Sequence, residues 1–589
     1  MPERELLKLD LDASSLGAAV HAVMEALGDT LPVLPKGVAI EPAEPLVRTT
    51  RGEASAELGE PLSQEPVYSA NEQATIQGNI IPGFNKDHQE FLFLRIDSVA
   101  NAKTWLQWIA PKISSLRDVL PFVRAHRAAR FERGVAEPGL TSCWINIGFS
   151  HSAIARLVSA ADADAFGDES FLQGLSARSS HLGDPTDESL PGNRTNWVVG
   201  GPDNEADILV IVAADSTTDL DQTVAELLER IDKSGVELVY RQRGDALPGA
   251  LSGHEHFGFK DGVSQPGVRG RLSDQLGGYI TPRFLKPGSD PNDPRARIFA
   301  KPGQALVWPG EFLLGEPRQS SEDFEASAAP ASNFPSWAKL GSYMVCRRLN
   351  QDVVAFWSFA TASAHSLGMA PEKFASMLVG RWMSGAPVMR VSDRDDPALG
   401  GDPWANNHFV FDDDTRPSPL TEIPGYSGDN FYQAKADVLG SVCPHFSHIR
   451  KINPRDNATD LGKAQDGFIR MILRRGIPFG PPIAGVKSPP VDLINQERGL
   501  MFLCYGATIE DQFEFLSRRW ANTTSQPNFG GHDPIIGQTD TEGDRERTIE
   551  FPTAGGIRTI KLSRDWVVPT GGGYFFAPPI DAISKVLGA

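Results

Sequence analysis

The order of short apolar segments constrains the fold of this chain more than any other feature of its sequence. Between residues 90 and 240, short runs rich in branched and aromatic residues alternate with longer amphipathic runs. Short runs of this kind predict strands, and longer runs with a helical period predict helices. The order strand–helix–strand, occurring twice, is that of a ferredoxin-like α+β unit with an antiparallel sheet. The predicted strands are 90–96, 142–148, 207–213 and 236–240, and the predicted helices are 101–113, a segment ending at 157, and 219–234.

A related pattern recurs after a connection over residues 286–340, which is rich in Pro, Ser, Asp and Gly. We therefore expect an α+β fold with two ferredoxin-like halves, 76–285 and 341–589. An N-terminal extension over 1–75 is predicted to hold a short helix at 14–27 and a Pro/Glu-rich arm. In the second half the predicted strands are 341–349, 468–473, 499–505 and 573–577, and the predicted helices are 371–379, 509–520 and 580–586.

Charge and cysteine usage argue against several classes of function. The 589 residues carry a net charge of −19, from 75 acidic and 56 basic residues, whereas nucleic-acid binding needs a basic face. The four cysteines lie far apart, which is typical of a reducing compartment. The chain shows no basic and apolar leader and no apolar run of the roughly 18 residues that span a membrane. We expect a cytoplasmic protein without nucleic-acid or membrane partners; the sequence allows an oligomer.

A carboxylate stands between glycines in the run Gly258-Phe-Lys-Asp-Gly262. Glycines let the backbone take positive φ and approach a flat ligand closely. An Asp-Gly step alone is more often only a turn. The aromatic Phe259 and two histidines just upstream favour a ligand site at Asp261.

The best candidate for an axial metal ligand is His448, which lies near Arg450, Lys451 and Arg455. Cations in this position could pair with the two propionates of a haem. His445, three residues earlier, is the rival, because the two would share one face of a helix. The other histidines show no metal-ligand spacing.

Two arginines, Arg474 and Arg475, follow the predicted strand 468–473. Side chains alternate between the faces of a strand, so one guanidinium can point inward and the other outward. On the residues alone, an ordinary ion pair is the better explanation for both. Hydrolase and nucleotide-binding motifs are absent from the sequence.

Taken together, these segments resemble the dye-decolorizing peroxidase family, in particular its larger intracellular bacterial branch. The similarity extends from about residue 75 to 589 with the motifs in the family's order. The matching runs are Ile76-Gln-Gly-Asn-Ile-Ile, Gly258-Phe-Lys-Asp-Gly-Val-Ser-Gln-Pro266, Gly341-Ser-Tyr-Met-Val-Cys-Arg-Arg-Leu, Val379-Gly-Arg-Trp-Met-Ser-Gly-Ala-Pro387, Cys443–Arg455, Leu473-Arg-Arg-Gly-Ile-Pro-Phe-Gly, Gly531-His-Asp-Pro-Ile-Ile-Gly and Gly571-Gly-Gly-Tyr-Phe-Phe.

The resemblance implies a fold of the dimeric α+β barrel type, with one haem b between the sheet and the helices of the C-terminal half. It identifies His448 as the proximal ligand and metal-binding residue, and Asp261 and Arg474 as the distal catalytic pair. Arg455 would contact a propionate, and Glu510, with Asp511 as its rival, would hydrogen-bond the proximal imidazole. Further contacts to the haem are implied for Gly262, Val263 and Ser264.

The implied reaction is a peroxidase reaction. Hydrogen peroxide would bind the ferric haem opposite His448, Asp261 would move a proton to the leaving oxygen, and Arg474 would stabilise charge as the O–O bond breaks. Dyes, phenols and other small donors would then supply single electrons. Because an unperturbed Asp titrates near ~3.9, we expect an acidic optimum.

The sequence departs from the family pattern at two positions. Glu316 follows Leu-Gly where many relatives carry a tyrosine, and Gly476 stands where some carry a distal asparagine. The residues alone also leave other functions open: a haem carrier or sensor without turnover, haem iron release or oxygenation in the same pocket, or a cofactor-free protein in which every residue above is structural.

Overall fold

The computed structural model describes residues 65–133, 141–231, 235–273, 278–282, 298–301, 303–402, 405–412, 436–483, 491–539, 545–562 and 564–589. Its centre is a nine-stranded sheet in which every paired neighbour is antiparallel. The strand order is β11-β13-β10-β16-β2-β3-β1-β4, and β12 also pairs with β13. The α+β prediction is confirmed, while the predicted helix at 14–27 lies outside the described residues.

Half of this sheet is a ferredoxin-like unit from the N-terminal part of the chain. Its strands lie in the order β2-β3-β1-β4, and α6, α8 and α12 connect them. The sequence predicted each of these elements to within a few residues at either end. They are β1 His88–Ile96, α6 Val99–Ile109, β2 Cys143–Phe149, α8 His151–Leu157, β3 Ile208–Ala214, α12 Thr217–Ile231 and β4 Val236–Asp245.

The other half repeats the same strand order with later segments. β16 lies beside β10, β10 beside β13, and β13 beside β11 and β12. The segment 509–521 is helical as predicted but forms π-helical turns, η9 and η10. The bounds are β10 Ser342–Gln351, α15 Pro371–Val379, β11 Leu473–Arg474, β12 Ile477–Phe479, β13 Gly499–Gly506, η9 Ile509–Glu514, η10 Leu516–Ala521, β16 Val567–Ala577, α19 Ile580–Ala582 and η11 Ile583–Leu587.

One predicted strand is wrong. The sequence pattern predicts an extended segment over 468–473, but the 3₁₀ helix η8, Ala464–Arg470, covers half of it, and the strand begins only at Leu473. Asp466 explains the difference, because its carboxylate accepts hydrogen bonds from Thr459 Oγ1 (3.0 Å) and from the backbone N–H of Lys463 (3.0 Å). A carboxylate bonded to the residue three positions earlier caps a helical turn.

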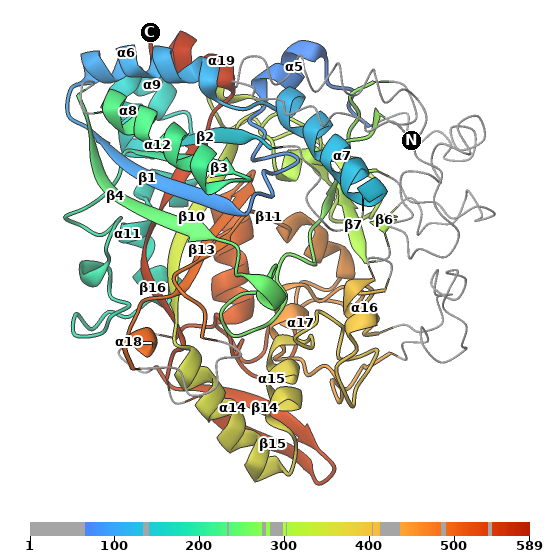
Figure 1. Ribbon diagram of the computed structural model, residues 1–589. Helices are drawn as coiled ribbons and strands as arrows, with labels where there is room; N and C mark the ends of the chain where they lie inside the picture. Colours follow the sequence, from blue (N-terminus) through green and yellow to red (C-terminus); the bar gives the residue numbers. More distant parts are fainter. Residues whose placement is uncertain are drawn as a thin grey trace, which may run out of the picture.

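Both faces of the sheet are covered. Along β3, Ile208, Val210 and Val212 belong to the core under α6, α8 and α12, whereas Leu209 and Ile211 belong to a second core on the opposite face. This alternation follows from the two-residue period of a strand. Figure 1 shows α6, α8 and α12 gathered over one side of the sheet, with α7, Leu116–Arg133, at the other end of the view.

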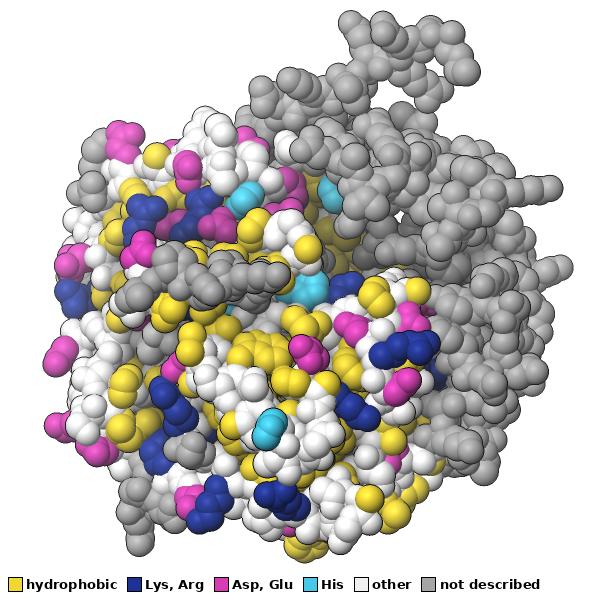
Figure 2. All heavy atoms as spheres, turned by 60° about the horizontal axis from the view of Figure 1, so that its bottom comes forward, with side chains coloured by type: hydrophobic (Ala, Val, Ile, Leu, Met, Phe, Trp, Pro, Cys, Tyr) yellow, Lys and Arg dark blue, Asp and Glu magenta, His cyan; other side chains and the backbone are white. Residues whose placement is uncertain are grey.

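A separate layer lies at one end of the molecule. It consists of α14, Val353–Leu367, α15 and the hairpin β14–β15, Arg547–Thr553 and Gly556–Leu562, which share a third core. Figure 2 shows this end of the molecule with acidic and basic side chains interspersed on its described surface. Among the described residues, no helix is long and apolar enough to cross a membrane.

Candidate active site

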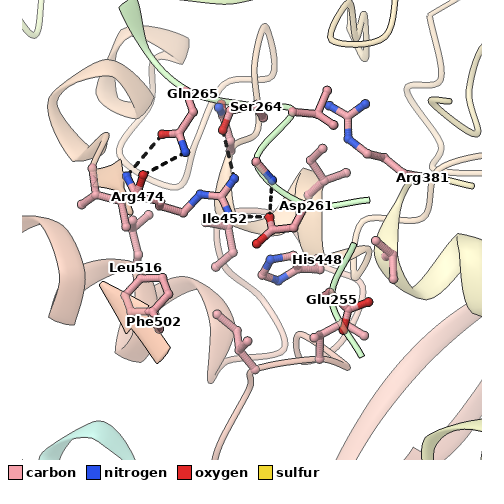
Figure 3. A pocket seen from close by; sticks show the side chains of 18 of the residues that line it. Glu255, Asp261, Ser264, Gln265, Arg381, His448, Ile452, Arg474, Phe502 and Leu516 are labelled. Atoms are coloured by element: carbon pink, nitrogen blue, oxygen red, sulfur yellow. Dashed lines mark hydrogen bonds and ion pairs between the residues drawn. The ribbon is translucent and has the colours of Figure 1, made fainter. Parts of the chain in front are cut away.

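A cavity of about 280 Å³ opens at the end of the C-terminal half of the sheet. The end of β10 and the starts of β13 and β16 contribute apolar walls through Leu349, Phe502 and Val567. The loop 255–266 from the N-terminal half lies across it (Figure 3). Of the site residues predicted from the sequence, seven line this cavity: Asp261, Gly262, Val263, Ser264, His448, Arg455 and Arg474.

Backbone geometry holds Asp261 in place. Gly258 and Gly262 have φ of +98° and +73°, values that favour glycine. The backbone N–H of Asp261 donates to Gly253 O at 2.9 Å, and the N–H of Gly262 donates to Asp261 Oδ1 at 2.6 Å. The positive φ that the sequence predicted at these glycines is therefore present, and the turn that they form fixes the backbone of Asp261.

Arg474 faces Asp261 from β11. Its Nη1 donates to Asp261 Oδ1 at 2.8 Å and its Nη2 to Ser264 O at 3.0 Å. Its backbone is fixed on both sides by the Gln265 side chain, which accepts from Arg474 N and donates to Arg474 O (Figure 3). Burial opposes ionisation of Asp261, but the charge and hydrogen bond of Arg474 outweigh it and lower the pKa of the carboxyl below its usual value.

Both hydrogen bonds reach the same oxygen of Asp261. Arg474 and Gly262 donate to Oδ1, and no hydrogen bond engages Oδ2 within the described part of the chain. The carboxylate is thus anchored through one oxygen while the other can exchange a proton with a ligand in the cavity.

His448 is the first residue of a short helix, α17, His448–Ile452. Its Nδ1 donates to Asp533 Oδ2 at 2.8 Å. The side chain of Asp533 is fully buried, and its Oδ1 accepts from the N–H groups of Ile535 and Ile536 at 2.8 and 3.0 Å. Because Nδ1 is engaged, Nε2 is the nitrogen available to a metal. Burial lowers the pKa of His448, but the Asp533 charge outweighs this and raises it above its usual value.

The prediction that Glu510 bonds the proximal imidazole is wrong. Glu510 is exposed, and its backbone N–H donates to Asp168 Oδ2 at 3.3 Å. Its rival Asp511 is paired with Arg470 at 3.1 Å. The sequence did contain a signal for the true partner, because Asp533 lies in the matching run Gly531–Gly537.

Two arginines, the buried Arg381 and the partly buried Arg455, line the cavity beside this pair of residues. Arg455 Nη2 donates to Ser264 Oγ at 2.9 Å and to Asn407 Oδ1 at 3.2 Å, and Arg381 Nη2 donates to the same Asn407 oxygen at 2.9 Å. Within the described ranges, neither guanidinium forms a salt bridge with a carboxylate. Burial lowers the pKa of Arg455 to about 10. Burial also lowers the pKa of Arg381, and the nearby positive charge of Arg455 lowers it further. Such uncompensated cations call for an anionic ligand.

These features fit a haem. One imidazole nitrogen faces the cavity, apolar side chains form its walls, and two guanidiniums without carboxylate partners match the propionates. Arg381 was not singled out from the sequence, although it lies in the matching run 379–387. Glu255 was also missed; it lines the cavity and accepts from the N–H groups of Phe257 and Phe259 at 2.8 and 2.9 Å.

Comparison with known proteins gives one consistent answer. Residues 75–248 match the family model described as the DyP dimeric alpha+beta barrel domain. The chain is 30% identical to dye-decolorizing peroxidase msp1 of Mycetinis scorodonius, over 90% of this chain and 92% of the relative. It is 27% identical to the multifunctional dye peroxidase DyP2 of an Amycolatopsis species, over 86% and 94% of the two chains. Its fold superposes on an ancestral D-type dye decolorizing peroxidase with a TM-score of 0.66 at 30% identity, covering 88% of this chain and 99% of the other.

Proposed function

The chain belongs to the dye-decolorizing peroxidase family, and on that premise we propose that it is a haem b peroxidase that uses hydrogen peroxide to oxidise dyes, phenols and other one-electron donors. One observation carries the proposal: the Asp261–Arg474 pair and the His448–Asp533 pair meet at the same cavity. A haem carrier requires the imidazole as a ligand but does not require a carboxylate placed for proton transfer. Release of iron from haem bound in the same pocket is the alternative function.

In this proposal the residues divide the work between two sides of the cofactor. Haem b, when bound, supplies the iron that binds peroxide and the redox capacity for single-electron oxidations. His448 would hold the iron through Nε2, and Asp533 makes that imidazole more basic through Nδ1. Arg455 and Arg381 would contact the propionates.

Proton transfer falls to Asp261. Its Oδ2 would take a proton from one oxygen of hydrogen peroxide and return it to the other, leaving oxygen, as general base and then general acid. Arg474 keeps the carboxylate ionised and stabilises negative charge on the leaving oxygen. Because the pKa of Asp261 is lowered, the base stays available in acid, in keeping with an acidic optimum.

Three substitutions test this assignment. Asp261→Asn and Arg474→Leu should keep the Soret band but slow the reaction with peroxide by roughly 10²- to 10⁴-fold, the usual contribution of a positioned acid–base group. His448→Ala should weaken haem retention or change its spectrum. Asp393→Asn, at an exposed pair, is the matched control and should behave as wild type. Wild-type protein that binds haem but oxidises no dye above free haemin would favour a carrier.

Three finer assignments belong to the same proposal. We place the protein in the larger bacterial branch of the family, although the relatives named above include a fungal enzyme as well as one from Amycolatopsis. We assign it to the cytoplasm, supported by four cysteines that form no disulfide. We also propose that the protein can form an oligomer, in line with the word dimeric in the name of the matching domain. Sedimentation of the haem-loaded protein and fractionation of its source cells would test the last two.

A further inference from the structure

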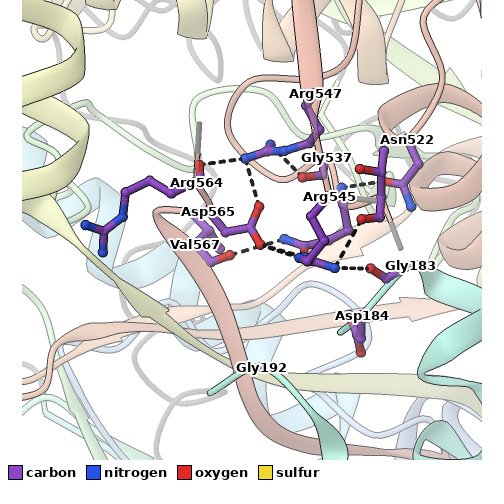
Figure 4. A network of polar contacts seen from close by, with 12 residues as sticks. Gly183, Asp184, Gly192, Asn522, Gly537, Arg545, Arg547, Arg564, Asp565 and Val567 are labelled. Atoms are coloured by element: carbon purple, nitrogen blue, oxygen red, sulfur yellow. Dashed lines mark hydrogen bonds and ion pairs between the residues drawn. The ribbon is translucent and has the colours of Figure 1, made fainter. Parts of the chain in front are cut away.

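The turn that carries Asp533 is itself held by an arginine from the neighbouring hairpin. Arg547, the first residue of β14, donates from Nη1 to Gly537 O at 2.6 Å and, more weakly, to Asp533 O at 3.5 Å. The backbone closes the same turn, since Gly537 N–H donates to Asp533 O at 3.2 Å. Arg547 therefore contacts both ends of the five-residue turn whose first side chain reaches His448. Figure 4 shows Arg547 beside Gly537, at the far end of that turn.

Arg547 is fixed on its other side. Its Nη2 donates to Arg564 O at 3.0 Å and pairs with Asp565 Oδ1 at 2.9 Å. The other oxygen of Asp565 accepts from Arg545, whose Nη2 also reaches Gln538 Oε1, directly after the turn. The side chain of Arg547 is 1% exposed, so its charge is deeply buried and is balanced locally by Asp565.

The next residue of β14 strengthens the same attachment. Thr548 N–H donates to His532 Nδ1 at 3.0 Å, and His532 N–H donates to Thr548 O at 2.8 Å. The residue before Asp533 is thus paired with the residue after Arg547. The start of β14 consequently contacts the Asp533 turn at both of its ends.

We propose that Arg547, held by Asp565, is a positioning residue that fixes the Asp533 carboxylate against the proximal imidazole. This inference rests on the proposed function, because its effect is measured on haem bound at His448. A hydrogen bond to a ligating imidazole depends on distance and angle, and its strength sets how basic the ligand is. Loosening the turn should weaken that bond and make the imidazole a poorer donor to iron.

The first alternative is that Arg547 has a structural role only, in the packing of the core. It would then affect folding stability but not the electronic state of the haem. A second alternative is that Arg547 acts by charge alone. Removing the cation would then make Asp533 a stronger acceptor and shift the haem in the opposite direction. On loss of Arg547, the positioning role predicts a raised midpoint potential of the bound haem. A purely structural role predicts an unchanged potential, and a charge effect alone predicts a lowered one.

The experiment uses the full chain loaded with haem b. The variants are Arg547→Gln and Arg547→Lys, with Asp533→Asn as the reference for a lost imidazole bond. Arg564→Gln is the matched control, because its side chain is 63% exposed and only its backbone carbonyl contacts Arg547. The readouts are the Fe(III)/Fe(II) midpoint potential and the Fe–His stretching frequency of the ferrous protein, with melting temperature measured alongside.

We expect Arg547→Gln to raise the potential and lower the Fe–His frequency, in the direction of Asp533→Asn but by less. Arg547→Lys, which keeps the charge and one donor group, should recover part of the shift, and Arg564→Gln should show none. The rate with peroxide should fall about 10-fold in Arg547→Gln, as for other partners of metal ligands.

An unchanged or lowered potential in folded Arg547→Gln overturns the proposal. If that variant does not fold, Arg547→Lys decides instead, because it keeps the positive charge but cannot make all the hydrogen bonds of the guanidinium to the turn and to Arg564 O; an unshifted potential there overturns the proposal equally. Wild-type protein without a Soret band after haem-replete expression would instead refute the proposed function itself, which keeps the two failures distinct.

Discussion

At the scale of single residues, the proposed catalysis depends most on the unequal contacts of the two carboxylate oxygens of Asp261. Oδ1 is occupied by Arg474 and Gly262, and this anchors the group without consuming the oxygen that must carry a proton. The same contacts overcome the effect of burial and lower the pKa of the carboxyl. The guanidinium of Arg474 therefore contributes both to the position of the Asp261 carboxylate and to its ionisation.

A change in Arg474 should move the acid limb of the reaction with peroxide. The base must be ionised to act, so the rate constant falls as pH drops through the pKa of Asp261. Arg474→Leu removes the cation that lowers this pKa, so the limb should move to higher pH, by about one unit or more. Rapid-mixing measurements of the rate constant between about pH 3 and pH 7 would show it.

Arg474→Lys is the control for that prediction. It keeps a positive charge near Asp261, so its acid limb should stay close to that of wild type even if the maximal rate falls. A limb that does not move in Arg474→Leu would mean that a group other than Asp261 accepts the proton.

The residues of the site could be predicted from the sequence only in part. Asp261, Arg474 and His448 stand in distinctive local runs, and the structure brings them to one cavity. The run Gly531–Gly537 marked the segment of Asp533, but its pairing with His448 could not be predicted, because it joins positions 85 residues apart and forms only through tertiary packing. Glu510 was predicted from the resemblance of its local run to the family, and such a match does not show what a side chain contacts across the fold.

At the scale of elements, the position of His448 depends on how closely α17 packs against the end of α15. Gly380 ends α15 with a φ of +97°, and a Cβ at this position would lie 2.1 Å from Ile449 Cγ2, next to the imidazole. Ser447 Oγ also donates to Met377 O in α15. The glycine is thus required both by its conformation and by the close approach of α17.

Gly380→Ala should destabilise the protein by about 3 kcal/mol, from backbone strain and from overpacking together. It should also weaken haem retention, because relief of the clash displaces α17. Thermal melts and haem titration would measure the two effects. Adding Ile449→Ala should restore the packing part of the loss and leave the strain.

A matched glycine in the same layer provides the control for this prediction. Gly368 ends α14 with a φ of +67°, but a Cβ added there would have no atom within 4 Å of it among the described residues. Gly368→Ala should cost only about 1 kcal/mol and leave haem binding unchanged. Equal losses at the two positions would contradict the packing argument.

Most elements of the sheet were predicted from the sequence because their apolar periods are clear, as in β3, which is buried along its whole length. The failures have local causes. Residues 468–473 look extended, but the Asp466 cap makes a helical turn of the first half. The hairpin β14–β15 was missed because β15 is largely exposed and carries little apolar signal.

At the scale of the whole molecule, net charge should select among donors that reach the surface. The chain carries a formal net charge of −19 at neutral pH, which attracts cations and repels anions over about one Debye length. This field acts on encounter rates and not on the chemistry inside the cavity.

We therefore expect kcat/KM for a cationic dye to fall several-fold between about 10 and about 200 mM salt, and that for an anionic anthraquinone dye to stay level or rise. Steady-state assays at fixed pH would show the divergence. A neutral phenol is the control and should respond little. If kcat/KM responded to salt in the same way for both dyes, the surface at which donors bind would not carry the negative charge of the chain as a whole.

The two halves of the sheet meet at a single paired position, Phe576 with Phe149, where β16 reaches β2. β16 also starts at the cavity wall with Val567, and it follows every other strand of the sheet in chain order. During translation, Asp261 and His448 therefore leave the ribosome well before the strand that joins their surroundings into one surface. A nascent chain can hold both residues and still lack the cavity wall at Val567, so the cavity is complete only after synthesis has passed β16.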